Sequence, residues 1–335
     1  MSKLFIGIDI GATWTRIALA DPSGTIIKRI AFKTPKTGDE YAIPRAIIDA
    51  IKKEFSQYLD RVERIGVGSI GPLDLSKGMV TGAPNVPTHR FEIARPIMEE
   101  LRKPVYVAND CVAAIWGEKM FGAARGHENA VYITLSTGIG GGIILNGALL
   151  LGKKGNGHEI GHIVVDTQRI MKCNCGGYGH WEAYCGGASI PRYASYLLER
   201  MEVGEEVRKS SKVFKAFEEG SLTTELIYSA AKEGDEIALR IINAVNRFNI
   251  AGFESVVNIY DPEIIIVGGS IALNNPELVV DPIRSAIESG RGLLTDPPKI
   301  VLTPLGGDAC LRGAIAIAID PPRELLKLLK YLGSS

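Results

Sequence analysis

The sequence lacks an excess of charge of either sign, because 38 Lys and Arg residues balance 38 Asp and Glu residues. Proteins that bind nucleic acid or a membrane surface usually carry a basic patch, so this balance favours neither partner. No apolar run reaches the ~20 residues that a membrane-spanning helix needs. The segment before the first apolar run also lacks the polar region and cleavage site of a signal peptide. We therefore expect a cytoplasmic protein.

Cysteine and histidine are scarce as well, with five residues of each. In a reducing compartment, a few cysteines are more typical of thiols or metal ligands than of disulfides. A chain of 335 residues can bury about three quarters of its unfolded surface, so it needs no disulfides for stability. At roughly 100–200 residues per domain, this length predicts two domains.

Two hairpins with glycine-centred turns begin the two halves of the chain. The first runs from Leu4 to Ala20 and the second from Ala130 to Asn146, which indicates a duplicated core. Strands and helices alternate along the chain, so the predicted class is α/β. We expect a smaller N-terminal domain of residues 1–117, joined by the C-terminal helix from about residue 310, and a larger domain of residues 118–309.

The first glycine turn combines a carboxylate with hydroxyls, at Asp9, Gly11 and Thr13. Glycine lets backbone N–H groups approach an anion closely. An aspartate beside a phosphate requires a cation between them, and Mg²⁺ is the usual one. Taken alone, the segment is equally typical of a plain hairpin turn with a capping aspartate.

The second turn, residues 136–142, contains four glycines and two hydroxyls. No Lys-Ser/Thr pair follows the glycines, which excludes a P-loop, and a strand rather than a helix follows, which disfavours a Rossmann fingerprint. A third turn, Gly268-Gly269, ends another predicted strand. Ligands bind at strand ends in open α/β sheets, so three such turns together predict a nucleotide site.

Asn109 and Asp110 follow a buried strand and precede a predicted helix that runs to about Phe121. One interpretation of Asp110 is a simple helix N-cap. The other is a general base, because a carboxylate can take the proton of a hydroxyl that attacks a phosphate. Asn109 can both donate to and accept from a sugar hydroxyl.

The segment from Glu159 to Glu182 supplies two thiols and two imidazoles, at His162, Cys173, Cys175 and His180. Tetrahedral zinc accepts two Cys and two His ligands. We therefore expect a structural zinc site that fixes a loop whose flanking carboxylates face a polyol. The alternative is a pair of free cysteines and two unrelated histidines.

Together these motifs resemble the ROK family of sugar kinases and repressors, within the hexokinase/actin superfamily. The resemblance extends from about residue 4 to about residue 318, and its motifs appear in family order at residues 9–16, 71–74, 83–87, 109–110, 136–142 and 159–182. Two positions depart from the family pattern. Ala12 stands where a second glycine is usual, and His180 stands where a third cysteine is usual.

The resemblance implies a two-domain actin/hexokinase-like (ribonuclease H-like) fold, with duplicated mixed sheets flanked by helices and a cleft between the domains. It also implies a homodimer or homotetramer. The implied nucleotide-binding residues are Asp9, Gly11, Ala12, Thr13, Thr137, Gly138, Gly268 and Gly269. The implied sugar-binding residues are Asn85, Asn109, Asp110, Glu159, His162 and Glu182, so His162 would serve both the sugar and the zinc.

The function that follows is Mg²⁺- and ATP-dependent phosphorylation of a hexose, first of all glucose to glucose 6-phosphate, with Asp110 as general base. N-acetylmannosamine or N-acetylglucosamine is the alternative substrate. A sugar-responsive repressor of the same family would need a helix-turn-helix before the phosphate motif. Because Asp9 is the ninth residue, we expect no such segment.

Overall fold

The computed structural model describes residues 2–36, 39–82 and 90–333. By its internal contacts the chain divides into two compact units. The first unit contains Met1–Tyr132, Gly141–His158 and Thr303–Ser335, and the second contains Ile133–Gly140 and Glu159–Leu302. The boundary expected at residues 117–118 stays a prediction.

The first five-stranded sheet has the order β3-β2-β1-β4-β8 and contains the predicted N-terminal hairpin. Strands β1 (Leu4–Ile10), β2 (Trp14–Ala20) and β3 (Ile26–Lys33) are antiparallel neighbours. Strands β1, β4 (Val62–Ser69) and β8 (Val105–Asn109) are parallel. The apolar run of β1 is buried along almost its whole length, as is typical of a strand that is covered on both faces.

The second sheet repeats this arrangement, with the order β11-β10-β9-β12-β13. The second predicted hairpin forms β9 (Ala130–Leu135) and β10 (Ile139–Leu145), and β11 (Ala148–Leu149) pairs antiparallel with β10. Strands β12 (Ile264–Gly268) and β13 (Lys299–Leu302) are parallel. The duplicated core expected from the two hairpins is therefore confirmed. A small third sheet contains β5 (Leu73–Asp74), β6 (Met79–Val80) and β7 (Phe91–Glu92).

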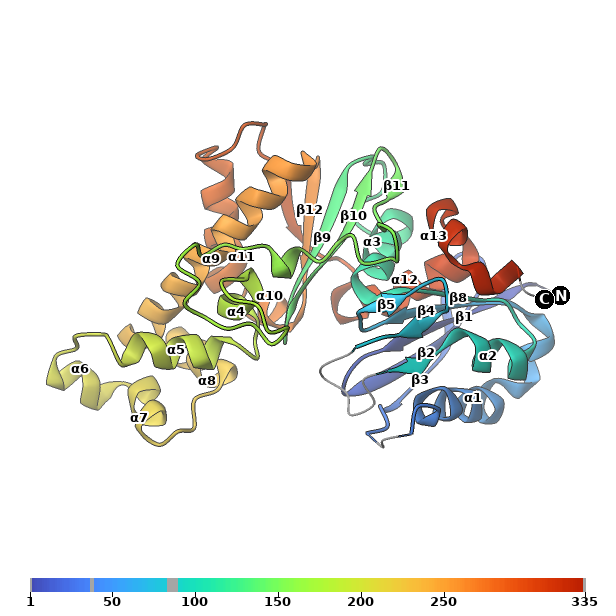
Figure 1. The fold of residues 1–335 in the computed structure, drawn as a ribbon, viewed down its shortest axis with the longest axis horizontal. Helices are drawn as coiled ribbons and strands as arrows, with labels where there is room; N and C mark the ends of the chain where they lie inside the picture. The colour runs from blue at the N-terminus through green and yellow to red at the C-terminus, as the bar shows by residue number, and fades with distance from the viewer. Residues whose placement is uncertain (1, 37–38, 83–89, 334–335) are drawn as a thin grey trace. The chain divides into compact units, whose positions relative to one another are not determined.

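Helices cover both faces of the first sheet (Figure 1). Helices α1 (Ala42–Phe55) and α2 (Ala94–Leu101) lie on one face, and α12 (Ala309–Ile319) packs against β1 and β4 on the other. Helix α12 also packs closely against α3 (Asp110–Phe121). This close approach depends on Gly313, where a Cβ atom would collide with the backbone carbonyl of Ala113. The last α-helix of the described residues is α13 (Arg323–Leu328).

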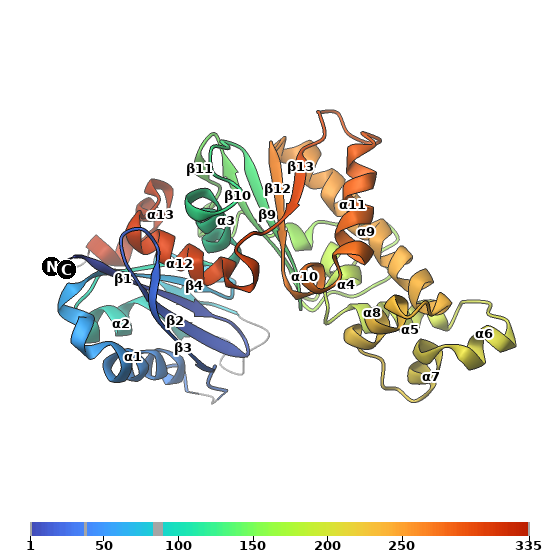
Figure 2. The ribbon, with the colours of Figure 1, turned by 180° about the vertical axis from the view of Figure 1, so that it is seen from behind.

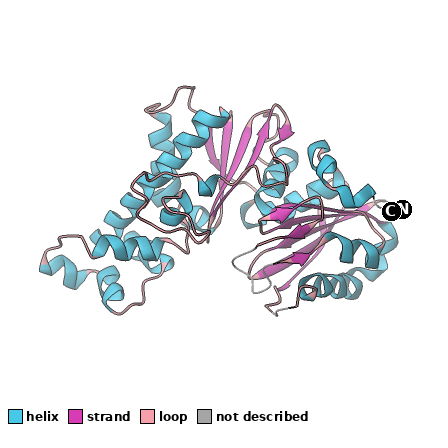
Figure 3. Cartoon of the chain, viewed as in Figure 1, coloured by secondary structure: helices cyan, strands magenta, loops and turns pink. Residues whose placement is uncertain are grey.

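The second unit is mainly helical between residues 181 and 288 (Figure 3). Its helices are α4 (Trp181–Cys185), α5 (Ile190–Leu198), α6 (Glu205–Ser210), α7 (Lys212–Glu218), α8 (Thr224–Lys232), α9 (Glu236–Tyr260), α10 (Ser270–Asn274) and α11 (Pro276–Glu288). Helix α9 packs against α4, α8 and α11. The Trp181 side chain is fully buried, and its indole N–H donates to Asn249 of α9 at 2.9 Å. Among the described residues, every helix is too short or too polar to cross a bilayer.

Candidate active site

The carboxyl ends of three parallel strands bring the first predicted motifs to one edge of the first sheet. In the strand register, Ile10 lies beside Ser69, and Ser69 lies beside Asn109. The turn that follows β1 and the start of α3 therefore lie at the same edge. Two motifs that are a hundred residues apart in the sequence, around Gly11 and Asp110, belong to one surface.

Asp9 lies in a group of charged residues at this edge. Its Oδ2 is 3.6 Å from Arg16 Nη1, and Arg16 is in turn 3.8 Å from Asp308, which forms a two-point ion pair with Arg29. Burial raises the pKa of the Asp9 carboxyl, while a hydrogen bond from the Cys310 thiol and the charge of Arg16 lower it. Sequence reasoning did not single out Arg16, although the hairpin register places it directly opposite Asp9.

Hydrogen bonds fix the turn after β1. The Gly11 N–H donates to Trp14 O at 3.0 Å, and the Thr34 hydroxyl donates to Gly11 O at 2.8 Å. Ala12 and Thr13 lie in this turn, and Thr13 is exposed. Both hydrogen bonds form with alanine at position 12 of the turn.

Asp110 is the first residue of α3, and the N-cap is Asn109, not Asp110 as the cap interpretation assumed. The Asn109 side chain accepts a hydrogen bond from the Cys111 N–H at 2.9 Å. Asp110 Oδ1 lies 2.8 Å from the same N–H. Asp110 is half-buried, whereas Asn109 is 7% exposed. Capping therefore explains Asn109 more fully than it explains Asp110.

The other two glycine turns lie side by side in the second unit. Gly269 has φ +89°, and a Cβ atom there would collide with the backbone of Leu135 at the end of β9. The hydroxyls of Ser136 and Ser270 are 3.1 Å apart. Both views place α10 and α4 at the same end of β9 and β12 (Figures 1 and 2). Two of the three predicted turns therefore lie next to each other. The nucleotide site that all three turns would form stays a prediction.

A cavity of about 330 Å³ adjoins these turns. Thr137, one of the predicted nucleotide-binding residues, lines it together with Ser136 and Ser270. Its other wall contains Thr223, Thr224 and Glu225 at the start of α8, which sequence reasoning did not single out. The Thr224 hydroxyl donates to Gly187 O at 2.7 Å, so the walls are tied together. Hydroxyls, a carboxylate and a glycine turn suit a ligand that carries both hydroxyl and phosphate groups.

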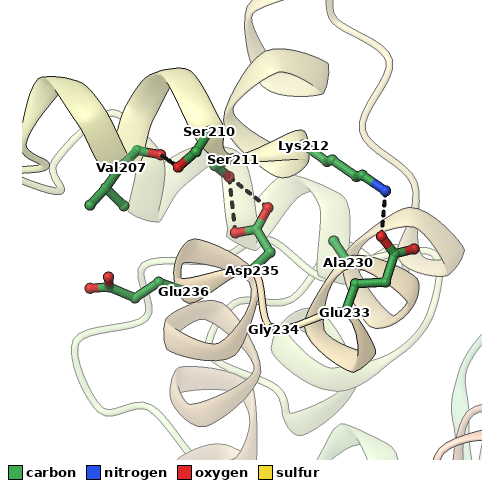
Figure 4. A pocket seen from close by; sticks show the side chains of 9 residues that line it. All are labelled: Val207, Ser210, Ser211, Lys212, Ala230, Glu233, Gly234, Asp235 and Glu236. Carbon is green, nitrogen blue, oxygen red and sulfur yellow. Dashed lines mark hydrogen bonds and ion pairs between the residues drawn. The ribbon is translucent and has the colours of Figure 1, made fainter.

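A second cavity, of about 370 Å³, lies between the α6–α7 turn and the start of α9 (Figure 4). Its polar groups are partners of one another: Ser211 donates to both carboxylate oxygens of Asp235, and Lys212 pairs with Glu233. Asp235 also caps α9. Among the described residues, none of the predicted site residues lines this cavity, so we do not assign the active site to it.

The four predicted metal ligands come together. The ligand atoms of His162, Cys173, Cys175 and His180 all lie within 4.8 Å of one another. Cys175 Sγ is 3.3 Å from His180 Nδ1, and Cys173 Sγ is 3.7 Å from His162 Nδ1. Tetrahedral zinc, with bonds of about 2.3 Å to sulfur and about 2.1 Å to nitrogen, separates its ligand atoms by roughly 3.5 Å. The donor set and spacing therefore fit zinc.

Glu159 and Glu182, two other predicted sugar residues, lie against this cluster. His162 Nε2 is 3.8 Å from Glu159 Oε2, whereas the other ring nitrogen, Nδ1, is the one near Cys173 Sγ. Glu182 accepts a hydrogen bond from the Ile139 N–H at 2.9 Å. Asn85 lies outside the described residues.

Comparisons with known proteins place the chain in a family. The model of the ROK family matches residues 5–321. The glucokinases of Pyrobaculum calidifontis and Aeropyrum pernix are 39% and 38% identical, each over 96% of this chain and over 97% and 98% of their own lengths. A ROK family glucokinase from Streptomyces griseus, solved in complex with glucose and AMPPNP, is 33% identical with a TM-score of 0.72, over 96% of this chain and 99% of its own.

The chain therefore belongs to the ROK family, and it is a sugar kinase. Its fold is the actin/hexokinase-like fold that the motifs predicted, with mixed sheets flanked by helices. The predicted family, fold class and enzyme class are confirmed. The roles of individual residues stay predictions.

Proposed function

We propose that the chain is a glucokinase that transfers the γ-phosphoryl group of ATP to the 6-hydroxyl of glucose, with Asp110 as general base. The observation that carries this proposal is the shared sheet edge, at which Asp110 and the turn after Asp9 both lie. A base for the hydroxyl and a binding site for phosphate are the two parts that phosphoryl transfer needs together.

In this mechanism Asp110 accepts the proton of the sugar hydroxyl as the hydroxyl oxygen attacks the γ-phosphorus. The new bond joins that oxygen to phosphorus, the bond to the β-phosphate oxygen breaks, and ADP leaves. Asn85, Asn109, Glu159, His162 and Glu182 hold the other sugar hydroxyls. Positioning of the hydroxyl is as important as basicity, because phosphoryl transfer depends mainly on alignment and charge stabilisation.

ATP-dependence follows from the kinase class, and we assign its phosphates to the three glycine turns. The residues are Asp9, Gly11, Ala12, Thr13, Thr137, Gly138, Gly268 and Gly269. Asp9 would hold Mg²⁺, directly or through water, and bound Mg²⁺ neutralises charge on the phosphate oxygens. The cavity lined by Thr137 and Ser270 would receive the nucleoside.

We assign a structural role to the His162, Cys173, Cys175 and His180 cluster. Bound zinc supplies a cross-link that fixes the loop between Glu159 and Glu182. These two glutamates then present carboxylates to the sugar. The match to glucokinases favours glucose over N-acetylmannosamine or N-acetylglucosamine. A cytoplasmic location and a homodimer or homotetramer complete the proposal.

The test of the base is the Asp110→Asn variant. We expect kcat to fall by roughly 10²–10⁴ while glucose still binds, because the amide keeps the shape of the carboxylate but cannot take a proton. ADP release by a coupled assay measures kcat, and calorimetry measures glucose binding. Asp60→Asn, at an exposed surface position, is the matched control. Near-normal turnover in Asp110→Asn would refute the assigned role.

A further inference from the structure

The Glu182 carboxylate lies between the metal-ligand cluster and the loop of residues 136–138, which joins β9 to β10 and forms the first part of the predicted glycine turn. Its Oε2 accepts the Ile139 N–H at 2.9 Å, and its Oε1 is 3.8 Å from Cys173 Sγ. Gly138 has no room for a Cβ atom because the Glu182 carboxylate occupies that space. One side chain thus contacts a predicted metal ligand and the backbone of a predicted phosphate loop.

The backbone around α4 holds the same loop from its other side. After α4 ends, the Gly187 N–H donates to Ser136 O at 2.7 Å, and the Ala188 N–H donates to Thr137 O at 2.9 Å. The helix itself begins directly after His180, one of the cluster residues. Helix α4 therefore connects a metal ligand at its start to the loop residues at its end.

Further contacts hold α4 and the residue that precedes His162 in place. Trp181 is fully buried and bonded to Asn249 of α9. On the opposite flank, Gly161 precedes His162 and abuts the backbone of Ile139, so closely that a Cβ atom would collide with Ile139 O. Movement of the cluster residues would therefore be transmitted to Ile139 through both flanks.

We propose that Glu182 is a positioning residue that couples metal binding at the cluster to the shape of the loop between β9 and β10. The proposal rests on the proposed function, in which this loop holds nucleotide phosphates. A bound metal fixes His180 and Cys173, which fixes the first turn of α4 and keeps the Glu182 carboxylate on the Ile139 N–H. The coupling is reciprocal, so nucleotide binding increases metal affinity by the factor by which metal increases nucleotide affinity.

The test measures AMPPNP affinity without sugar, so that any role of Glu182 in sugar binding does not enter. We expect removal of the metal by a chelator to weaken AMPPNP binding by roughly tenfold to a hundredfold, as for a lost hydrogen bond to a charged group. Glu182→Ala is expected to weaken binding to a similar degree, with little further loss on chelation. Glu182→Gln keeps an acceptor for the Ile139 N–H and is expected to retain the metal dependence. Glu277→Ala, in the first turn of α11, is the matched control.

Amide hydrogen exchange at Ile139 is the second readout, and it needs no nucleotide. We expect faster exchange in metal-stripped protein and in Glu182→Ala than in the metal-loaded wild type. Cys175→Ala removes an exposed ligand without touching Glu182, and it is expected to reproduce the effect of the chelator. Metal content, measured for every variant, separates loss of metal from loss of the Glu182 contact.

Two outcomes would overturn the coupling: unchanged exchange at Ile139 in Glu182→Ala, or an equal effect of chelation on AMPPNP affinity in wild type and Glu182→Ala. Failure of all metal-loaded forms to bind AMPPNP would count against the proposed function instead. The exchange measurement would then still decide whether metal shapes the loop.

Discussion

At the residue scale, Glu118 is a fully buried carboxyl on α3, the helix that begins with Asp110. It accepts hydrogen bonds from the Thr303 hydroxyl and from the Ala123 N–H. Burial raises the pKa of Glu118, and these two hydrogen bonds oppose the rise. The folded protein therefore retains a proton on Glu118 at a pH at which the unfolded chain has released it.

This shift has a defined sign in the pH dependence of stability. The stabilisation that Glu118 derives from its proton is complete below its unfolded pKa and is lost as pH rises through the higher folded pKa. Gln does not titrate. The unfolding free energy of the wild type minus that of Glu118→Gln should therefore fall as pH rises from about 4. Urea unfolding across pH measures it. Glu63→Gln, at a surface position, controls for the loss of one charge. A difference that rises with pH would contradict the prediction.

The sequence predicts contacts between residues of one hairpin, but it does not predict contacts between residues far apart in the chain. Asp9 and Arg16 are opposite each other in a hairpin, and a correct hairpin prediction suffices to pair them. Thr303, which bonds Glu118, and Cys310, which bonds Asp9, come from the other end of the chain, as does Asp308, which pairs with Arg16. No local pattern signals such pairs, because they depend on the docking of α12 onto the first sheet.

At the element scale, α3 is positioned by α12. The backbones of the two helices meet at Gly313 and Gly117, where a Cβ on either residue would collide with the facing helix. Such contact fixes the height of α3 on the sheet, and with it the position of Asp110. The sequence led us to expect a helix after Asp110 and another from about residue 310, but it did not predict that glycine would bring their backbones together.

We expect Gly313→Ala to destabilise the protein by roughly 2–4 kcal/mol, because the added methyl overlaps the Ala113 carbonyl. In the protein that still folds, kcat should fall by about tenfold or more, since a small displacement of a catalytic group is costly. Gly307 precedes the same helix, but it has open space around it. Gly307→Ala should therefore leave the unfolding free energy and kcat nearly unchanged. Chemical unfolding and ADP release test the pair, and equal effects of the two substitutions would contradict this account of α3.

At the scale of the whole molecule, the two five-stranded sheets share one order of strands. The turn between β1 and β2 in the first sheet corresponds to the turn between β9 and β10 in the second. The turn after β12 corresponds to the end of β4. Each hairpin turn contains one glycine and at least one hydroxyl side chain, so the two copies keep related turns at related places. The two glycine-turn hairpins in the sequence made this repetition predictable. The division of the chain into two compact units was not predictable in this way, because it depends on contacts between residues far apart in the sequence.

A ligand that binds only the folded protein stabilises the whole chain by mass action. At a ligand concentration of a hundred times Kd, the gain is about 2.7 kcal/mol, which corresponds to a rise in melting temperature of roughly 5 °C for a chain of this size. We expect glucose, and separately AMPPNP with Mg²⁺, to produce such a rise. N-acetylmannosamine, N-acetylglucosamine and L-glucose at the same concentration should produce little, since the proposed site discriminates by hydroxyl placement.

Differential scanning fluorimetry against this sugar panel, followed by ADP release with ATP and Mg²⁺, tests the assignment of glucose in two independent ways. A larger shift and faster turnover with an N-acetylated hexosamine than with glucose would move the substrate to that alternative while leaving the kinase class intact. A shift with glucose but no turnover in the presence of ATP would count against phosphoryl transfer and in favour of sugar sensing. Because binding and turnover are read separately, each outcome identifies which part of the proposal is wrong.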